Sequence, residues 1–111
     1  MGRNLEPHEI ALLLLMYDRG IVGKAGYINI AHVASRIKWQ KIQSTFGTKD
    51  SIDKAARKLV KKMYLSDDGK SMKVLYVDKI GVDFCKGYLA TFPTAMQDLE
   101  AKLYHRQGIN D

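Results

Sequence analysis

The sequence predicts an α+β domain that is mostly helical, and three observations support this fold class. Apolar residues recur at helical spacing in three segments between residues 7 and 63. Two short segments, 63–66 and 73–77, flank an Asp-Gly turn and show the pattern of a β-hairpin. From residue 82 to 103, apolar residues alternate at spacings of three and four, which predicts a helical C-terminal segment.

The size of the chain indicates a single domain, because 111 residues can enclose one hydrophobic core but not two. We expect residues 1–78 to form its main body and residues 79–111 a C-terminal helical segment within one compact unit. No apolar run is long enough to span a bilayer, and the first residues lack the pattern of a signal peptide. The sequence therefore predicts a cytoplasmic protein that does not associate with a membrane.

The first predicted helix begins at Pro7, which suits the first helical position, and ends before Gly20. Its apolar residues surround the helix axis almost completely and do not form a single stripe. A helix of this kind must be buried on more than one side. We therefore expect it to contact both the core of its own chain and a partner chain. A turn and a short strand at residues 27–28 follow it.

The second predicted helix follows Asn29, which can cap its N-terminus, and its apolar face includes Val33 and Ile37. Residues 39–49 are ambiguous, because they fit either an extension of this helix or a long turn. Gly47 is the most favourable break in this segment.

Asp50 is predicted to cap the third helix, which has an apolar face and a cationic face. Residues 36–62 contain nine Lys or Arg residues and two carboxylates, so their local charge is +7, whereas the whole chain has a net charge of +6. The basic charge is therefore concentrated on this segment. Such a field attracts polyanions, first nucleic acid and second an anionic membrane, because both release counterions when their phosphates are neutralised. The alternative is a helix face that is only solvated.

Other kinds of chemistry have little support in the sequence. The only cysteine, Cys85, excludes an intrachain disulfide and a cysteine-based zinc site within one chain, and we expect a buried free thiol. The three histidines do not have the spacing of metal ligands. No paired carboxylates, nucleophile–base pair or glycine-rich phosphate loop stands out, so we expect neither an enzyme nor a bound cofactor.

The C-terminal apolar pattern is a heptad seam over three repeats, which we expect to pair two chains with help from the first helix. Pro93 interrupts the pattern and should kink or split the helix near Leu89. The alternative is that the seam folds back on the first helix of its own chain. The residues expected in the dimer interface are Leu12, Leu15, Val82, Cys85, Leu89, Phe92, Met96, Leu99 and Leu103.

The order of elements over residues 7–77 resembles that of a winged helix-turn-helix domain: helix, short strand, helix, turn, basic helix and hairpin. The passage in which Gly81 and Phe84 follow the second strand is similar to the segment after the wing in small dimeric bacterial and archaeal regulators of this family. Asp78 departs from the Thr or Ser that often caps the next helix in that family, but it can serve as the cap itself. The resemblance implies a DNA-binding domain in residues 1–78, whose third helix enters the major groove, and a dimerisation helix in residues 79–111. The connection over residues 39–49 is longer than a compact helix-turn-helix requires.

This resemblance implies a homodimer that binds double-stranded DNA with sequence preference, as a transcriptional regulator. Arg57 is the best candidate for base contact, because a guanidinium can bind O6 and N7 of guanine bidentately, whereas lysines act as point charges on phosphate. The expected DNA-binding residues are Lys41, Thr48, Lys49, Ser51, Lys54, Arg57, Lys58 and Lys61, with Lys70, Ser71 and Lys73 in the wing. We expect Trp39 and Phe46 to pack beneath the long connection and not to stack on a base.

Three alternatives remain open at the level of sequence. A chromatin-type protein that coats DNA without sequence preference would share both fold and charge. A winged-helix interaction module could instead use its basic residues to dock an acidic protein. A small-molecule effector pocket between the first helix and the tail, lined by Met16, Tyr17, Tyr88 and Met96, has no support in the sequence.

Overall fold

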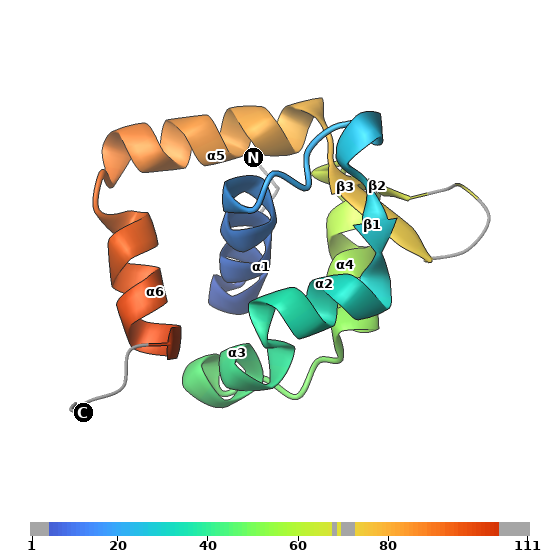
Figure 1. The fold of residues 1–111 in the computed structure, drawn as a ribbon. Helices are drawn as coiled ribbons and strands as arrows, with labels where there is room; N and C mark the ends of the chain where they lie inside the picture. Colours follow the sequence, from blue (N-terminus) through green and yellow to red (C-terminus); the bar gives the residue numbers. More distant parts are fainter. Residues whose placement is uncertain (1–4, 68, 70–72, 105–111) are drawn as a thin grey trace.

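The computed structural model describes residues 5–67, 69 and 73–104, and these residues form an α+β fold that is mostly helical (Figure 1). In chain order, the elements are α1 (Pro7–Asp18), the short 3-10 helix η1 (Lys24–Gly26), β1 (Ile28–Asn29), α2 (Ile30–Ile37), α3 (Trp39–Phe46), α4 (Ile52–Lys61), β2 (Leu65–Asp67), β3 (Val74–Val77), α5 (Lys79–Thr91) and α6 (Ala95–Tyr104). Within the described part of the chain, none of the helices combines the length and apolarity that crossing a membrane would require. The predicted fold class is confirmed at this level.

Helix α1 is the centre of the fold, and it contacts all five other α-helices and β3. Pro7 occupies its first turn as predicted, and Glu6 and Glu9 form a capping box at its N-terminus. Residues 11–16 are all buried, so the prediction of burial on more than one side is confirmed. The expected contact of this apolar surface with a partner chain was wrong for Leu12 and Leu15, because their own chain covers both side chains completely.

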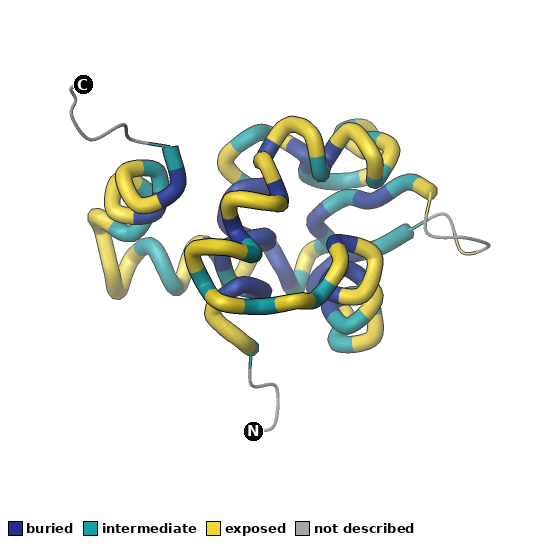
Figure 2. The backbone as a smooth tube through the Cα atoms, turned by 90° about the horizontal axis from the view of Figure 1, so that it is seen from below, coloured by how far each residue is buried: buried dark blue, intermediate teal, exposed yellow. Residues whose placement is uncertain are grey.

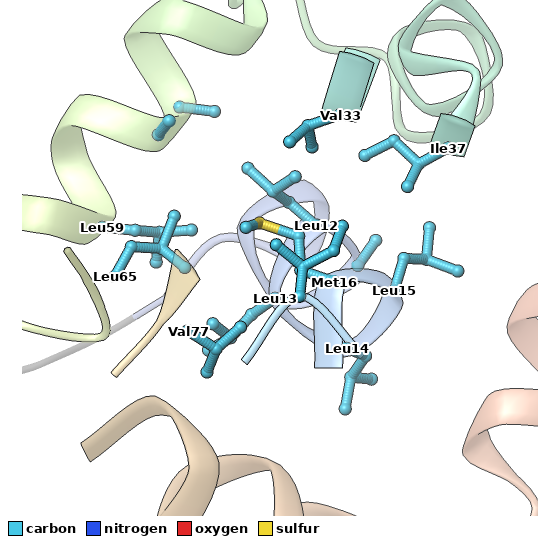
Figure 3. Packing of buried hydrophobic residues seen from close by; sticks show 14 of the residues in the cluster. Leu12, Leu13, Leu14, Leu15, Met16, Val33, Ile37, Leu59, Leu65 and Val77 are labelled. Atoms are coloured by element: carbon cyan, nitrogen blue, oxygen red, sulfur yellow. The ribbon is translucent and has the colours of Figure 1, made fainter. Parts of the chain in front are cut away.

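The core lies between α1 and the elements that surround it, and the outward sides of these elements are exposed (Figure 2). Figure 3 shows the leucines of α1 and Met16 next to side chains from α2, α4, β2 and β3. Met16 is completely buried in this cluster. It does not line the hollow between α1, α3, α5 and α6, so its proposed role in an effector pocket has no support.

The sheet has three antiparallel strands in the order β1-β3-β2. Ile28 lies opposite Leu75, and Ser66 lies opposite Tyr76. The predicted hairpin is confirmed, although its first strand begins at Leu65 and not at residue 63. Met63 adopts a positive φ of 72° and turns the chain out of α4, which delays the start of the strand. Strand β1, predicted at residues 27–28, likewise begins one residue later, at Ile28.

The ambiguous segment after α2 forms a separate helix, α3, which neither alternative had predicted. Lys38 adopts a left-handed backbone conformation, with φ 55° and ψ 66°, and separates α2 from α3. Gly47, also left-handed, ends α3 as predicted. Trp39 is buried and its indole N–H donates to the backbone oxygen of Asp50 at 3.0 Å, so its predicted packing beneath this connection is confirmed.

The C-terminal segment is split into α5 and α6 by a break at residues 92–94, as Pro93 predicts, although α5 continues two residues beyond Leu89. Both helices pack against α1, and α6 also packs against α3. Cys85, Leu99 and Leu103 are buried in the chain's own core. For these three residues the fold-back alternative is therefore correct, and their assignment to an open dimer seam was wrong.

The thiol of Cys85 is free and fully buried, as expected, and it lies 3.8 Å from the backbone oxygen of Leu13. Burial raises the pKa of this thiol to about 12. A thiol in this environment stays protonated at neutral pH and has no access to a cysteine of another chain.

Gly81 is required by the close packing of α5 against the backbone that precedes β2. A Cβ at this position would lie 2.2 Å from the backbone oxygen of Tyr64 and 2.7 Å from Cγ1 of Val77. The same oxygen accepts the N–H of Asp78, whose side chain caps α5 by accepting the N–H of Lys79. The spacing of Asp78, Gly81 and Phe84 thus has a structural reason in this chain, because Phe84 contacts the ring of Tyr64 at a centroid distance of 5.4 Å.

We expect Gly81→Ala to lower the free energy of unfolding by about 1–3 kcal/mol or more, because the added methyl group must displace backbone. Gly87 is the matched control, since it lies in the same helix and an added Cβ would have no atom within 4 Å. Gly87→Ala should instead raise stability by up to about 1 kcal/mol. Urea unfolding of both variants measures the difference. Equal stability of the two variants would show that α5 does not pack against Tyr64 as described.

Candidate nucleic-acid interface

Helix α4 has a sharp division between a buried face and a cationic face. Ile52, Ala55, Ala56 and Leu59 are buried, whereas Lys54, Arg57 and Lys61 are exposed on the opposite side. The helix is capped by Ser51, whose Oγ accepts the N–H of Lys54 at 3.1 Å. The predicted cap, Asp50, was wrong by one residue.

Asp50 instead connects three elements at the start of α4. Its carboxylate lies 3.1 Å from Nε2 of the buried His8 and 3.2 Å from Nζ of Lys58. Its backbone oxygen accepts from the indole N–H of Trp39 and, at 2.9 Å, from the side-chain amide of Gln43. Its own N–H donates to Oγ1 of Thr48. The residue therefore fixes the position of α4 relative to α1 and α3.

These contacts also change the ionisation of the cluster. Burial alone would raise the pKa of Asp50, but hydrogen bonds from Lys58 and His8 and the charges of Lys58 and Lys54 together lower it below its ordinary value. The hydrogen bond to Asp50 in turn raises the pKa of Lys58. Asp50 and Lys58 are both charged at neutral pH and hold each other in place.

The cations on and next to α4 fall into two sets, those that pair with a carboxylate of the chain and those that do not. Lys54, Lys58 and Lys62 form a row at intervals of four residues: Lys54 lies 3.6 Å and Lys58 3.2 Å from Asp50, and Lys62 lies 3.4 Å from the buried carboxylate of Glu9. Among the described residues, no carboxylate lies within ion-pair distance of Arg57 or Lys61. Arg57 and Lys61 are therefore the cations of α4 that no carboxylate of the described residues pairs with.

The structure brings most of the sequence-predicted site residues to one region around α4. Lys49 and Ser51 are exposed just before the helix. Thr48 is half-buried, and its hydroxyl oxygen accepts the N–H of Asp50. Lys41 is exposed on α3, and Lys73 is exposed just before β3. Lys70 and Ser71, predicted to be wing contacts, lie outside the described residues.

Sequence reasoning missed the roles of Asp50 and Glu9 as internal partners of the lysines. A local signal existed for Asp50, because a carboxylate four residues before a lysine can form a helical ion pair, and here it pairs with both Lys54 and Lys58. Glu9 is 53 residues away from Lys62 in the chain, and no local pattern could connect them.

A second feature is an apolar hollow between α1, α3, α5 and α6, with a volume of about 360 Å³. The hollow lies close to the position of the effector pocket considered from the sequence, but of the residues named there only Tyr88 lines it. Its other large apolar lining residues are Ile10, Leu14, Phe46, Phe92 and Leu99.

We compared the chain with models of protein families, with curated proteins and with solved structures, and none of these comparisons found a match. The functional interpretation therefore depends on the residues and geometry of this chain.

Proposed function

We propose that this chain is a winged helix-turn-helix protein that binds double-stranded DNA, with α4 as the helix that enters the major groove. The observation that carries the proposal is the outward face of α4, where Arg57 and Lys61 are exposed without a carboxylate partner among the described residues. An α-helix fits the width of the major groove. Lysines on this face would bind phosphates, and Arg57 would contact guanine.

The position of the hairpin supports the same proposal. The β2–β3 hairpin follows α4 directly, and α4 packs against β2 (Figure 1). A wing at this position would contact the backbone or minor groove beside the site of α4. Among the described residues of this wing, Lys73, just before β3, is an exposed cation. Lys70 and Ser71 are the other wing contacts that we propose.

We further propose that the protein acts as a homodimer and as a transcriptional regulator in the cytoplasm. Phe92 is 52% exposed, and it lines the apolar hollow together with Tyr88, whose ring centroid lies 4.9 Å away. In a two-fold dimer the same surface patch of each copy meets the other. Phe92 of one copy could thus fill the hollow of its partner, and the half-buried Val82, Leu89 and Met96 would extend this contact.

We expect binding to duplex DNA to weaken strongly with salt, because each phosphate neutralised by a cation adds about 0.9 to the slope of log K against log salt. Phosphate contacts from Lys49, Lys54 and Lys61 alone would give a slope of about −3, and each further phosphate contact would make it steeper by about 0.9. Fluorescence anisotropy of a labelled duplex at several salt concentrations measures this slope. Lys86→Ala, which removes an exposed lysine of α5, is the control and should leave the slope unchanged.

The same titration, repeated at one salt concentration with duplexes of different sequence, separates a regulator from a chromatin-type protein. A chromatin-type protein would bind all duplexes with similar affinity at fixed salt, whereas a regulator would prefer particular sequences by a factor of about a thousand or more. Absence of duplex binding even at low salt, together with binding to an acidic protein, would replace the DNA proposal with an interaction module.

A further inference from the structure

The junction between α2 and α3 combines an exposed lysine with an unfavourable backbone conformation. Lys38 has a φ of 55°, and among the described residues only Met63 shares a positive φ without being glycine. The left-handed region is unfavourable for residues with a Cβ, whereas glycine adopts it freely. At this helix end glycine would satisfy the backbone better, so the side chain of Lys38 requires a separate explanation.

Lys38 lines an open groove of about 690 Å³ between α2, α3 and the beginning of α4. The polar residues of this groove include Ser35 from α2, Gln40 and Lys41 from α3, and Ser51 from the N-cap of α4. These four residues and Lys38 are all exposed. None of the residues that line the groove is acidic.

The groove therefore has a positive charge that no acidic lining residue compensates, in contrast to Lys54 and Lys58 of α4, which pair with Asp50. Asp50 does not line the groove, and its carboxylate is paired with His8 and Lys58. Two lysines together with hydroxyl and amide groups match the chemistry of a phosphodiester backbone, which presents charge and hydrogen-bond acceptors at short intervals.

We propose that this groove binds the sugar–phosphate backbone of the DNA strand beside the one that α4 contacts, with Lys38 and Lys41 as its phosphate ligands. This inference rests on the proposed function and adds to it a second point of attachment outside α4. The separate helix α3 lengthens the connection between α2 and α4 and carries Lys41, while Lys38 occupies the left-handed junction just before it.

The test uses the opposite effects that Lys38→Gly should have on stability and on binding. Removing the side chain relieves the left-handed conformation, so the melting temperature should rise by about 4 °C. Removing the phosphate contact should weaken duplex binding about fivefold at 0.15 M salt and reduce the magnitude of the salt slope by about 0.9. Lys41→Ala should show the same loss of binding.

Met63→Gly is the matched control, because Met63 has the other positive φ and is 56% exposed but carries no charge. It should raise the melting temperature to a similar extent and leave binding unchanged. Lys86→Ala on α5 controls for the loss of one net charge and should change affinity less than twofold.

The outcomes distinguish the groove from the function on which it rests. The groove assignment would be overturned if Lys38→Gly and Lys41→Ala both bound with wild-type affinity, or lost no more affinity than Lys86→Ala. The proposed function would stand in that case, provided that Arg57→Ala still weakened binding. If the wild-type chain bound no duplex, the proposed function would fail and the groove assignment would fail with it.

Discussion

Replacing Leu103 with aspartate is expected to lower the free energy of unfolding by about 3 kcal/mol or more, because this side chain is 2% exposed and an unpaired carboxylate would be buried there. Leu103 lies on α6, which packs against α1 and α3. The neighbouring Tyr104 hydroxyl donates to the backbone oxygen of Ile37 at 2.7 Å and fixes the end of α6 against α2. Urea unfolding followed by circular dichroism measures the loss.

Phe92→Asp is the matched control, since it places the same charge at a side chain that is 52% exposed. Its effect on monomer stability should stay below about 1 kcal/mol, while sedimentation should show a shift from dimer to monomer. A stable Leu103→Asp variant that is monomeric would contradict the packing of α6 in the core and would restore the heptad seam as an interface.

Arg57→Ala is expected to weaken binding to preferred DNA sequences by about 1–3 kcal/mol, because a bidentate contact with guanine is lost. The binding should weaken less for unrelated sequences, which Arg57 contacts through phosphate at most. Competition titrations with preferred and unrelated duplexes at one salt concentration measure both losses.

Lys58→Ala provides the internal comparison on the same helix. Lys58 neighbours Arg57 in sequence, but its ammonium group lies 3.2 Å from the carboxylate of Asp50. We expect a smaller loss of DNA affinity than for Arg57, and no change in sequence preference. Equal and sequence-independent losses for both variants would show that Arg57 does not read bases.

Local signals predicted much of the fold. Pro7 and Gly20 bracket α1, Asn29 caps α2 by accepting the N–H of Ala31, and the break at Pro93 divides the C-terminal segment. Each of these features depends on residues within a few positions of one another. Backbone capping and the loss of a donor at proline act over this range, so the sequence contains the relevant information.

Features that depend on distant contacts could not be predicted. The partners of His8 and Lys62 are 42 and 53 residues away in the chain, and they decide which lysines of α4 are compensated. The heptad spacing showed that Leu99 would be buried but not whether its own chain or another would bury it. A spacing of three and four describes a helix face, and the packing partner is a property of the tertiary fold.

The measurement that tests the central claim most directly is a titration of the isotope-labelled protein with a duplex, followed by amide chemical shifts. If the outer face of α4 binds DNA, the largest changes should occur at Ser51, Arg57 and Lys61, with small changes at Lys86 on α5. Largest changes on α5 and α6, or no changes at low salt, would contradict the assignment of α4 as the DNA-binding helix.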